Sequence, residues 1–216
     1  DVIVSPSEFL RSELKRSLPD SRIDVIVNGI DDSHTPEAGK DEGYLLYVGR
    51  LSREKGVPTL ARAHQLMRNQ MPLKIVGHGP LYDEMVVDYP NAEFLGYVQQ
   101  GPALDALIQN ARAVVLPSEC YENCSMAVLE AMSFARAVVG ARIGGIPEQI
   151  RHGVEGLLFE PGNAQDLADA LDVMAENPAQ AHEMGLKGRV RLCQKYSLRK
   201  HMDTLLSLYR ELLARP

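Results

Sequence analysis

The 216-residue chain lacks the features that mark secreted, disulfide-linked and membrane-spanning proteins. Its three cysteines, Cys120, Cys124 and Cys193, include no C-x-x-C pair, and this odd count fits reduced thiols in a cytosol better than a disulfide framework. No apolar run approaches the roughly 18 to 20 residues of a membrane-spanning helix. The first residues have neither a basic start nor a cleavage site. We therefore expect a cytoplasmic protein.

A surplus of positive charge is also missing. The chain has 23 Lys and Arg against 29 Asp and Glu, a net charge of -6, whereas nucleic-acid-binding domains usually carry a strong basic excess. We expect no nucleic-acid partner, and an anionic ligand would need a local cluster of positive charge. Hydrophobic residues make up 45% of the chain and charged residues 24%, which is typical of a globular protein of one large domain or two small ones.

Short apolar runs alternate with stretches of helical periodicity along the chain, a pattern that predicts an α/β fold with a parallel sheet flanked by helices. We expect strands at 2–4, 24–27, 44–48, 73–76, 93–95, 113–116, 137–139 and 156–159, and helices at 58–68, 81–87, 103–110, 126–133 and 164–175. From 179 onward the pattern is helical, with a break near Tyr196-Ser197. The prediction is a single Rossmann-like, doubly wound domain over 1–216, with its core at about 1–178 and a C-terminal helical extension at about 179–216.

Two further segments are a polar loop and the last helix. The polar stretch 31–42 predicts a surface loop. The last helix carries an apolar stripe, which either packs on this domain or covers a second domain missing from the chain; its members are Met202, Leu205, Leu206, Tyr209, Leu212 and Leu213. Because the chain begins with Asp1 and its first five residues already read as a strand, we expect it to be part of a longer protein.

Glycine-rich turns follow two of the predicted strands, at the sheet edge where ligands bind in open α/β folds. The segment 49–56, G-R-L-S-R-E-K-G, concentrates positive charge at Arg50, Arg53 and Lys55 and suits a diphosphate, although taken alone it also fits a solvated loop with surface ion pairs. The segment 77–80, G-H-G-P, leads into a helix. Tyr82 stands where a dinucleotide fingerprint requires Gly or Ala, so we expect no nicotinamide or flavin site.

Two carboxylates flank a third strand-to-helix junction. Glu122 lies in the loop after strand 113–116, and Glu130 lies a little over one turn into a helix that starts at about Ser125, so both can face one cleft. The amides of 123–125 would be free helix-start donors for phosphate or sugar oxygens. Glu130 could accept hydrogen bonds from vicinal hydroxyls. Taken alone, the two carboxylates also fit capping and surface charge, but the three junctions together suit a ligand with phosphates and hydroxyls, such as a sugar nucleotide.

The segment 121–132, Y-E-N-C-S-M-A-V-L-E-A-M, resembles the E-x7-E motif of the retaining family 4 glycosyltransferases, whose GT-B fold consists of two Rossmann-like domains. Further motifs of that family are resembled, in the same order, by N-G-I-D at 28–31, G-R-L-S-R-E-K-G at 49–56, G-H-G-P at 77–80, F-L-G-Y-V at 94–98 and G-G-I-P-E at 144–148. The resemblance covers nearly the whole chain. It implies a C-terminal, nucleotide-sugar-binding domain whose N-terminal acceptor domain is absent from the chain.

The resemblance also implies a role for each matching position. Arg50 and Lys55 would neutralise the diphosphate, Glu122 would bind the donor sugar, and Glu130 would bind the ribose. The implied catalytic residues are Glu122, Arg50 and Lys55, and the implied donor-binding residues are Gly49, Arg50, Lys55, Gly77, Gly79, Tyr97, Val98, Glu122, Asn123, Cys124, Ser125, Leu129 and Glu130. The donor would be a UDP-, GDP- or ADP-sugar, with no obligatory cofactor and no metal ligands. N-C-S at 123–125 departs from the G-F-G of many members, so the donor sugar stays open.

The function expected from this resemblance is transfer of the sugar to an acceptor hydroxyl of a glycan, a lipid-linked molecule or a small molecule, with the isolated domain inactive. The alternatives are a non-catalytic sugar-nucleotide-binding module and a sugar-nucleotide epimerase of related fold. A basic cluster near the C-terminus fits either a solvated helical face or a patch that contacts the cytoplasmic face of an anionic membrane; it comprises Lys187, Arg189, Arg191, Lys195, Arg199 and Lys200.

Overall fold

A computed structural model describes residues 1–32 and 40–214. The main body is built on a six-stranded parallel sheet with the strand order β5-β4-β3-β6-β7-β8. The strands are β3 (Leu45–Val48), β4 (Leu73–Val76), β5 (Ala92–Gly96), β6 (Ala113–Leu116), β7 (Ala137–Ala141) and β8 (Gly156–Phe159). Each begins and ends within two residues of its predicted bounds, and the predicted Rossmann-like parallel sheet is confirmed.

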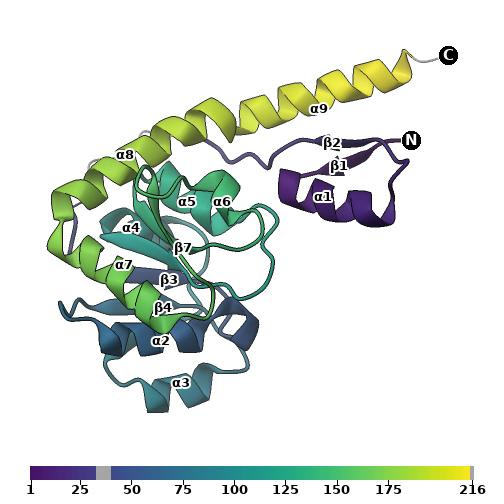
Figure 1. The fold of residues 1–216 in the computed structure, drawn as a ribbon. Coiled ribbons are helices and arrows are strands. Elements are labelled where there is room, and N and C mark those ends of the chain that lie inside the picture. The colour runs from purple at the N-terminus through teal and green to yellow at the C-terminus, as the bar shows by residue number, and fades with distance from the viewer. Residues whose placement is uncertain (33–39, 215–216) are drawn as a thin grey trace.

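Helices cover both faces of this sheet (Figure 1). One face packs against α2 (Val57–Leu66), α3 (Tyr82–Asp88) and α7 (Ala164–Glu176), and the other against α4 (Pro102–Asn110) and α5 (Met126–Ser133). α8 (Pro178–Lys195) contributes to both cores. In β3, Leu45 and Tyr47 belong to one core and Leu46 to the other, because successive side chains of a strand point to opposite faces. This two-sided burial accounts for the continuous apolar runs of the strands.

The order of the strands reverses direction between β3 and β6. The chain runs from β3 outward through β4 to β5, then returns to the other side of β3 and continues through β6 and β7 to β8. In open parallel sheets the loops at such a point diverge to opposite faces and leave a crevice at the carboxyl ends of the strands. The loops that follow β3 and β6 are the ones that carry Lys55 and Glu122.

The first residues form a separate unit beside the main body. β1 (Ile3–Ser5) pairs in parallel with β2 (Ile23–Val25) in a two-stranded sheet, and α1 (Glu8–Ser17) connects them. We call β1, α1 and β2 the N-terminal unit. The sequence pattern predicts both strands but neither the helix between them nor their separation from the main sheet.

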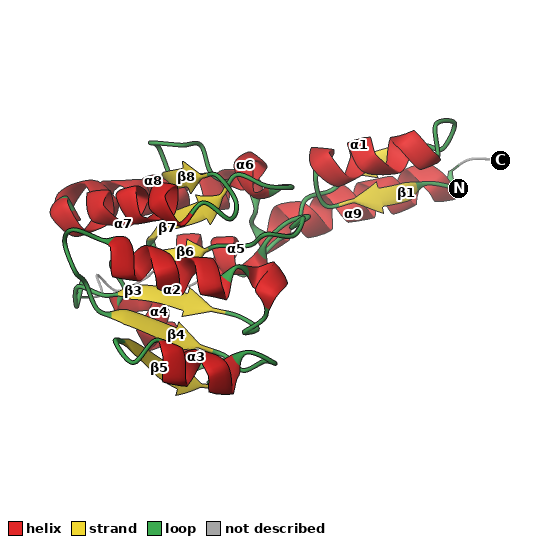
Figure 2. Cartoon of the chain, turned by 60° about the horizontal axis from the view of Figure 1, so that its bottom comes forward, coloured by secondary structure: helices red, strands yellow, loops and turns green. Residues whose placement is uncertain are grey.

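The long helix α9 (Leu198–Leu213) runs from the main body past the N-terminal unit (Figure 2). It follows α8 after the predicted break, where the Ser197 side chain accepts a hydrogen bond from the Lys200 amide. The Arg22 guanidinium lies 2.6 Å from the Glu211 carboxylate and links β2 to α9. Two short elements were not predicted, the 3-10 helix η1 (Arg53–Lys55) and α6 (Ile146–Gln149). Of the predicted loop 31–42, residues 33–39 lie outside the described residues.

Candidate functional site

A cavity of about 400 Å³ opens at the carboxyl ends of β3 and β4. Its lining contains six of the predicted donor-binding residues, namely Gly49, Arg50, Gly77, Tyr97, Val98 and Glu130, together with Val48, Val76, His78, Gln100 and Leu104. The remaining predicted residues are not in this lining. Leu129 is fully buried in the core under α5, so its side chain supports the site from behind. Gln100 and Leu104 also line the cavity but were not predicted from the sequence, because neither belongs to a recognisable motif.

The loops after β3 and β4 pack backbone against backbone. Gly77 has a φ of +135°, and a Cβ atom there would lie 1.8 Å from the carbonyl oxygen of Gly49. A Cβ on Gly79 would lie 2.3 Å from the carbonyl oxygen of Leu51. These two positions therefore require glycine for close approach and, at Gly77, also for conformation. The His78 ring stacks on Tyr82 with centroids 4.6 Å apart, as expected of a side chain that holds the turn.

An ion pair joins the loop after β3 to the loop after β6. Lys55 Nζ lies 2.5 Å from Glu122 Oε1, and the buried Ser118 hydroxyl donates to the same oxygen at 2.9 Å. Burial alone would lower the pKa of Lys55, but its hydrogen bond to Glu122 and the negative charge there outweigh burial and raise the pKa above its usual value. Lys55 is therefore positively charged, and the pair spans the point where the strand order reverses.

The Glu122 loop rests on the segment that contains α6. The amide of Gly145 donates to the Glu122 carbonyl oxygen at 2.6 Å, and a Cβ on Gly145 would lie 2.0 Å from the Asn123 carbonyl oxygen. The Gln149 side chain accepts from the Ser125 amide at 2.9 Å and donates to the Ser125 carbonyl oxygen at 3.0 Å. The prediction that all three amides of 123–125 are free is therefore wrong for Ser125, because a glutamine 24 residues away occupies that donor.

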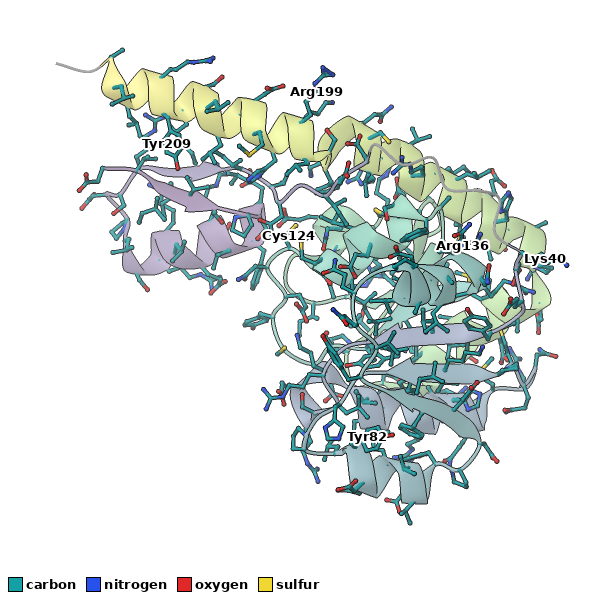
Figure 3. The ribbon with its side chains drawn as sticks, turned by 180° about the vertical axis from the view of Figure 1, so that it is seen from behind. Lys40, Tyr82, Cys124, Arg136, Arg199 and Tyr209 are labelled. Atoms are coloured by element: carbon teal, nitrogen blue, oxygen red, sulfur yellow. The ribbon has the colours of Figure 1, made fainter. Side chains whose placement is uncertain are left out.

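Two amides of this loop do remain available. Within residues 1–32 and 40–214, the amides of Asn123 and Cys124 have no hydrogen-bond partner. They precede α5, which begins at Met126 as predicted. Figure 3 shows Cys124 on the side of the main body that faces the N-terminal unit. The loop thus presents donors near Glu122 at the start of a helix, where anions and sugar oxygens bind well.

Glu130 lies one turn into α5 and is half-buried at the wall of the cavity. Burial raises the pKa of this carboxyl, and the nearby Asp105 carboxylate raises it further. Asp105 belongs to α4 and lines an adjoining cavity of about 580 Å³, which Glu130 also lines. Glu130 therefore lies between two cavities. Its carboxyl group binds its proton more tightly than an exposed carboxyl group does.

The basic cluster does not form one free surface. Arg189 donates to the Asp32 carbonyl oxygen, Arg191 donates to the carbonyl oxygens of Glu148 and Gln149, and Lys187 pairs with Glu183. Lys200 donates to the Gln194 carbonyl oxygen, and Lys195 Nζ lies 5.1 Å from the centroid of the Tyr196 ring. Five of the six charges therefore serve contacts within the protein, and a membrane contact stays a prediction. Over the described ranges, no helix is both long and apolar enough to cross a membrane. The same ranges contain no group of three or more His, Cys, Asp or Glu side chains that could hold a metal ion.

Comparison with known proteins places the chain in a family. The model of the family described as glycosyl transferases group 1 matches residues 42–177, more than half of the chain. The alpha-maltose-1-phosphate synthase of Mycolicibacterium smegmatis is 27% identical over 248 aligned residues, which cover 99% of this chain and 64% of that protein. The chain thus spans less than two thirds of the length of this relative.

Solved structures show the same fold. Sucrose-phosphate synthase from Thermosynechococcus elongatus superposes with a TM-score of 0.89 at 26% identity, covering 99% of this chain and 59% of that one. Anabaena HepE, solved in complex with UDP, superposes with a TM-score of 0.82 at 21% identity, covering 97% of this chain and 64% of that one. The family model, the relatives and the fold agree, and the chain belongs to the glycosyl transferases group 1, with the architecture of a C-terminal GT-B domain.

Proposed function

We propose that the chain binds a nucleotide-diphosphate sugar as the donor half of a retaining glycosyltransferase of family 4, which transfers the sugar to an acceptor hydroxyl. The observation that carries this proposal is the cavity at the carboxyl ends of β3 and β4, where Arg50 and Glu130 line the wall. The Lys55–Glu122 pair joins the loops after β3 and β6, where the strand order reverses. The complex of HepE with UDP supports a nucleotide ligand of this kind, since the two proteins share their fold.

The diphosphate would lie against Arg50, Lys55 and the free amides of Asn123 and Cys124. As the bond from sugar C1 to the diphosphate oxygen breaks through an oxocarbenium-like state, negative charge grows on the leaving phosphate, and the two cations stabilise it. The acceptor oxygen attacks C1 on the same face, and its proton passes to the leaving phosphate. Configuration at C1 is thereby retained without a covalent enzyme intermediate.

The two carboxylates would hold the hydroxyl groups of the donor. Glu130 would accept hydrogen bonds from the ribose, and Glu122 would position the sugar, with Lys55 and Ser118 holding the Glu122 carboxylate in place. The base would lie beside Tyr97 and Val98, where the Tyr97 side chain is 77% exposed at the mouth of the cavity. We place the acceptor site on a domain outside this chain, consistent with the greater length of its relatives.

Titration calorimetry of residues 1–216 with UDP-, GDP- and ADP-glucose tests the donor site. We expect one of the three to bind, and Arg50→Ala and Glu130→Ala each to weaken that binding by about tenfold or more, because each removes a charged contact. Arg53→Ala is the matched control, since Arg53 is an exposed arginine of the same loop that the proposal does not use. Absence of binding by all three, or equal effects of the three variants, would refute the donor site.

The complete protein tests the transfer reaction. With the missing part restored, we expect turnover with retention at C1 when an acceptor is supplied, and none from residues 1–216 alone. Donor binding without turnover by the complete protein would instead assign a non-catalytic module. Conversion of the donor sugar to its epimer without acceptor would assign an epimerase.

A further inference from the structure

The first turn of α1 is capped by a side chain from the main body. The Glu148 carboxylate accepts hydrogen bonds from the amides of Glu8 at 2.9 Å and Phe9 at 2.6 Å, across 140 residues of sequence. The first amides of a helix have no partner within the helix, and its N-terminus favours negative charge. The N-terminal unit is thereby fastened to α6 through one carboxylate that satisfies two amides.

The same turn of α1 also contacts the Glu122 loop. The Phe9 ring packs against Tyr121 with centroids 5.0 Å apart and planes inclined by 55°. Tyr121 immediately precedes Glu122, and its side chain is 69% exposed despite this contact. Phe9 therefore contacts two segments at once, α6 through its amide and the Glu122 loop through its ring.

α6 itself is tied to the rest of the body and to the Glu122 loop. The Glu148 carbonyl oxygen accepts from the Arg191 guanidinium at 2.9 Å and from the Tyr196 hydroxyl at 2.8 Å, which fixes it to the end of α8. On either side of Glu148, Gly145 and Gln149 make the hydrogen bonds described above to Glu122 and Ser125. One short helix thus connects the N-terminal unit, α8 and the loop that carries Glu122.

We propose that Glu148 and Phe9 are positioning residues that couple the N-terminal unit to the Glu122 loop. Seating of α1 on α6 presses Phe9 against Tyr121 and restrains the loop at the residue before Glu122. Release of α1 removes the ring contact and frees α6 from one of its anchors. The consequence for sugar binding rests on the proposed function, whereas the coupling itself rests on the contacts alone.

Hydrogen–deuterium exchange on residues 1–216 without ligand tests the coupling. In Glu148→Gln and Phe9→Leu we expect the hydrogen-bonded amides of Cys120 and Ser125 to exchange at least about threefold faster. The first amides of α1 should also exchange faster, while β6 and β7 keep their protection. Glu8→Gln and Phe9→Tyr are the controls. The first removes a carboxylate from the same helix start but keeps the amide, and the second keeps the ring. Faster exchange in α1 with an unchanged loop would overturn the coupling.

Donor binding then tests the positioning of Glu122. We expect the ratio of the dissociation constant of the nucleoside diphosphate to that of the nucleotide sugar to fall by about threefold or more in Glu148→Gln and Phe9→Leu. Binding of the nucleoside diphosphate should weaken less, because Arg50 and Lys55 hold the diphosphate from another loop. An unchanged ratio in variants with a faster-exchanging loop would overturn the positioning role. If the unaltered chain binds neither ligand, the proposed function fails, and the exchange measurement still decides the coupling.

Discussion

The main body and the N-terminal unit are assembled from the same parts, parallel strands joined through a helix, but they are stabilised differently. In the body, β6, β7 and β8 are buried along their whole length because helices cover both faces of the sheet. In the N-terminal unit, α1 has no buried residue and Val4 of β1 is 40% exposed. The body therefore depends on its own core, while the N-terminal unit depends on its attachments to α6 and α9.

α9 sharpens this contrast. Four members of its apolar stripe, Met202, Leu206, Tyr209 and Leu213, are exposed, whereas Leu208 is buried. Exposed apolar stripes of this kind mark surfaces that contact another protein or domain. Leu205 and Leu212 are half-buried, so the chain covers the predicted stripe only in part, and contact of the stripe with a further domain stays a prediction.

The largest expected effect comes from Gly77→Ala, a substitution in the main body at a point where two loops pack backbone against backbone. The added Cβ meets the Gly49 carbonyl oxygen in a backbone conformation that alanine rarely adopts. We expect the free energy of unfolding, measured in urea, to fall by about 3 kcal/mol or more, with loss of donor binding. Gly101→Ala is a matched control, since Gly101 has a φ of +136° but no atom within 4 Å of the new Cβ. Equal losses in the two variants would show that conformation alone matters.

Leu208→Ala should have the next largest effect, and it should act on α9 and the elements beside it, not on the body. Removing this buried side chain is expected to cost about 2–3 kcal/mol, read as faster hydrogen exchange in α9 and β1. Leu206→Ala, on the same helix but 42% exposed, should cost less than about 1 kcal/mol. Equally faster exchange in the main sheet would contradict an effect confined to α9 and its neighbours, and equal effects of the two leucines would contradict the burial pattern of α9.

The smallest expected effect is a shift in the pH dependence of donor binding through Glu130, which belongs to the main body. Because the pKa of Glu130 is raised by burial and by Asp105, donor binding through the ionised carboxylate should strengthen as pH rises through that pKa and weaken below it. Asp105→Asn removes a negative neighbour, lowers the pKa of Glu130 and should move the rise in affinity to lower pH. Calorimetry across pH 4 to 8 measures this, with Asp83→Asn on the exposed side of α3 as control. A profile that does not move would exclude Glu130 as the titrating group.

The same contrast explains what could be predicted from the sequence. The strands of the body follow from continuous apolar runs, and α5 begins where predicted because Ser125 precedes an apolar helical pattern. The glycine motifs locate the turns of the site, since only glycine permits the close approach at Gly77 and Gly79. Six predicted residues accordingly meet at one cavity.

The N-terminal unit was harder to predict for a physical reason. α1, with the sequence E-F-L-R-S-E-L-K-R-S, has only three apolar residues, Phe9, Leu10 and Leu14, and none of them is buried. They follow a helical spacing, but they are too few to stand out from the polar residues around them. Its ends do carry a signal, the Ser7 cap and the basic residues Lys15 and Arg16 in the last turn. Contacts across long sequence separations, such as that of Glu148 with α1 or of Gln149 with Ser125, leave no local pattern at all.

The segment that contains α6 holds the Glu122 loop mostly through the main chain of that loop. Gly145 and Gly144 approach the backbone of Glu122 and Asn123, and Gln149 binds the backbone of Ser125. The Gln149 amide also donates to the Cys124 sulfur at 3.6 Å, whereas the Asn123 side chain makes no hydrogen bond within the described residues. Asn123 is also exposed. The side chain of Asn123 can therefore change during divergence or laboratory evolution while the scaffold stays intact, and this position offers a place to alter the choice of sugar without refolding the protein.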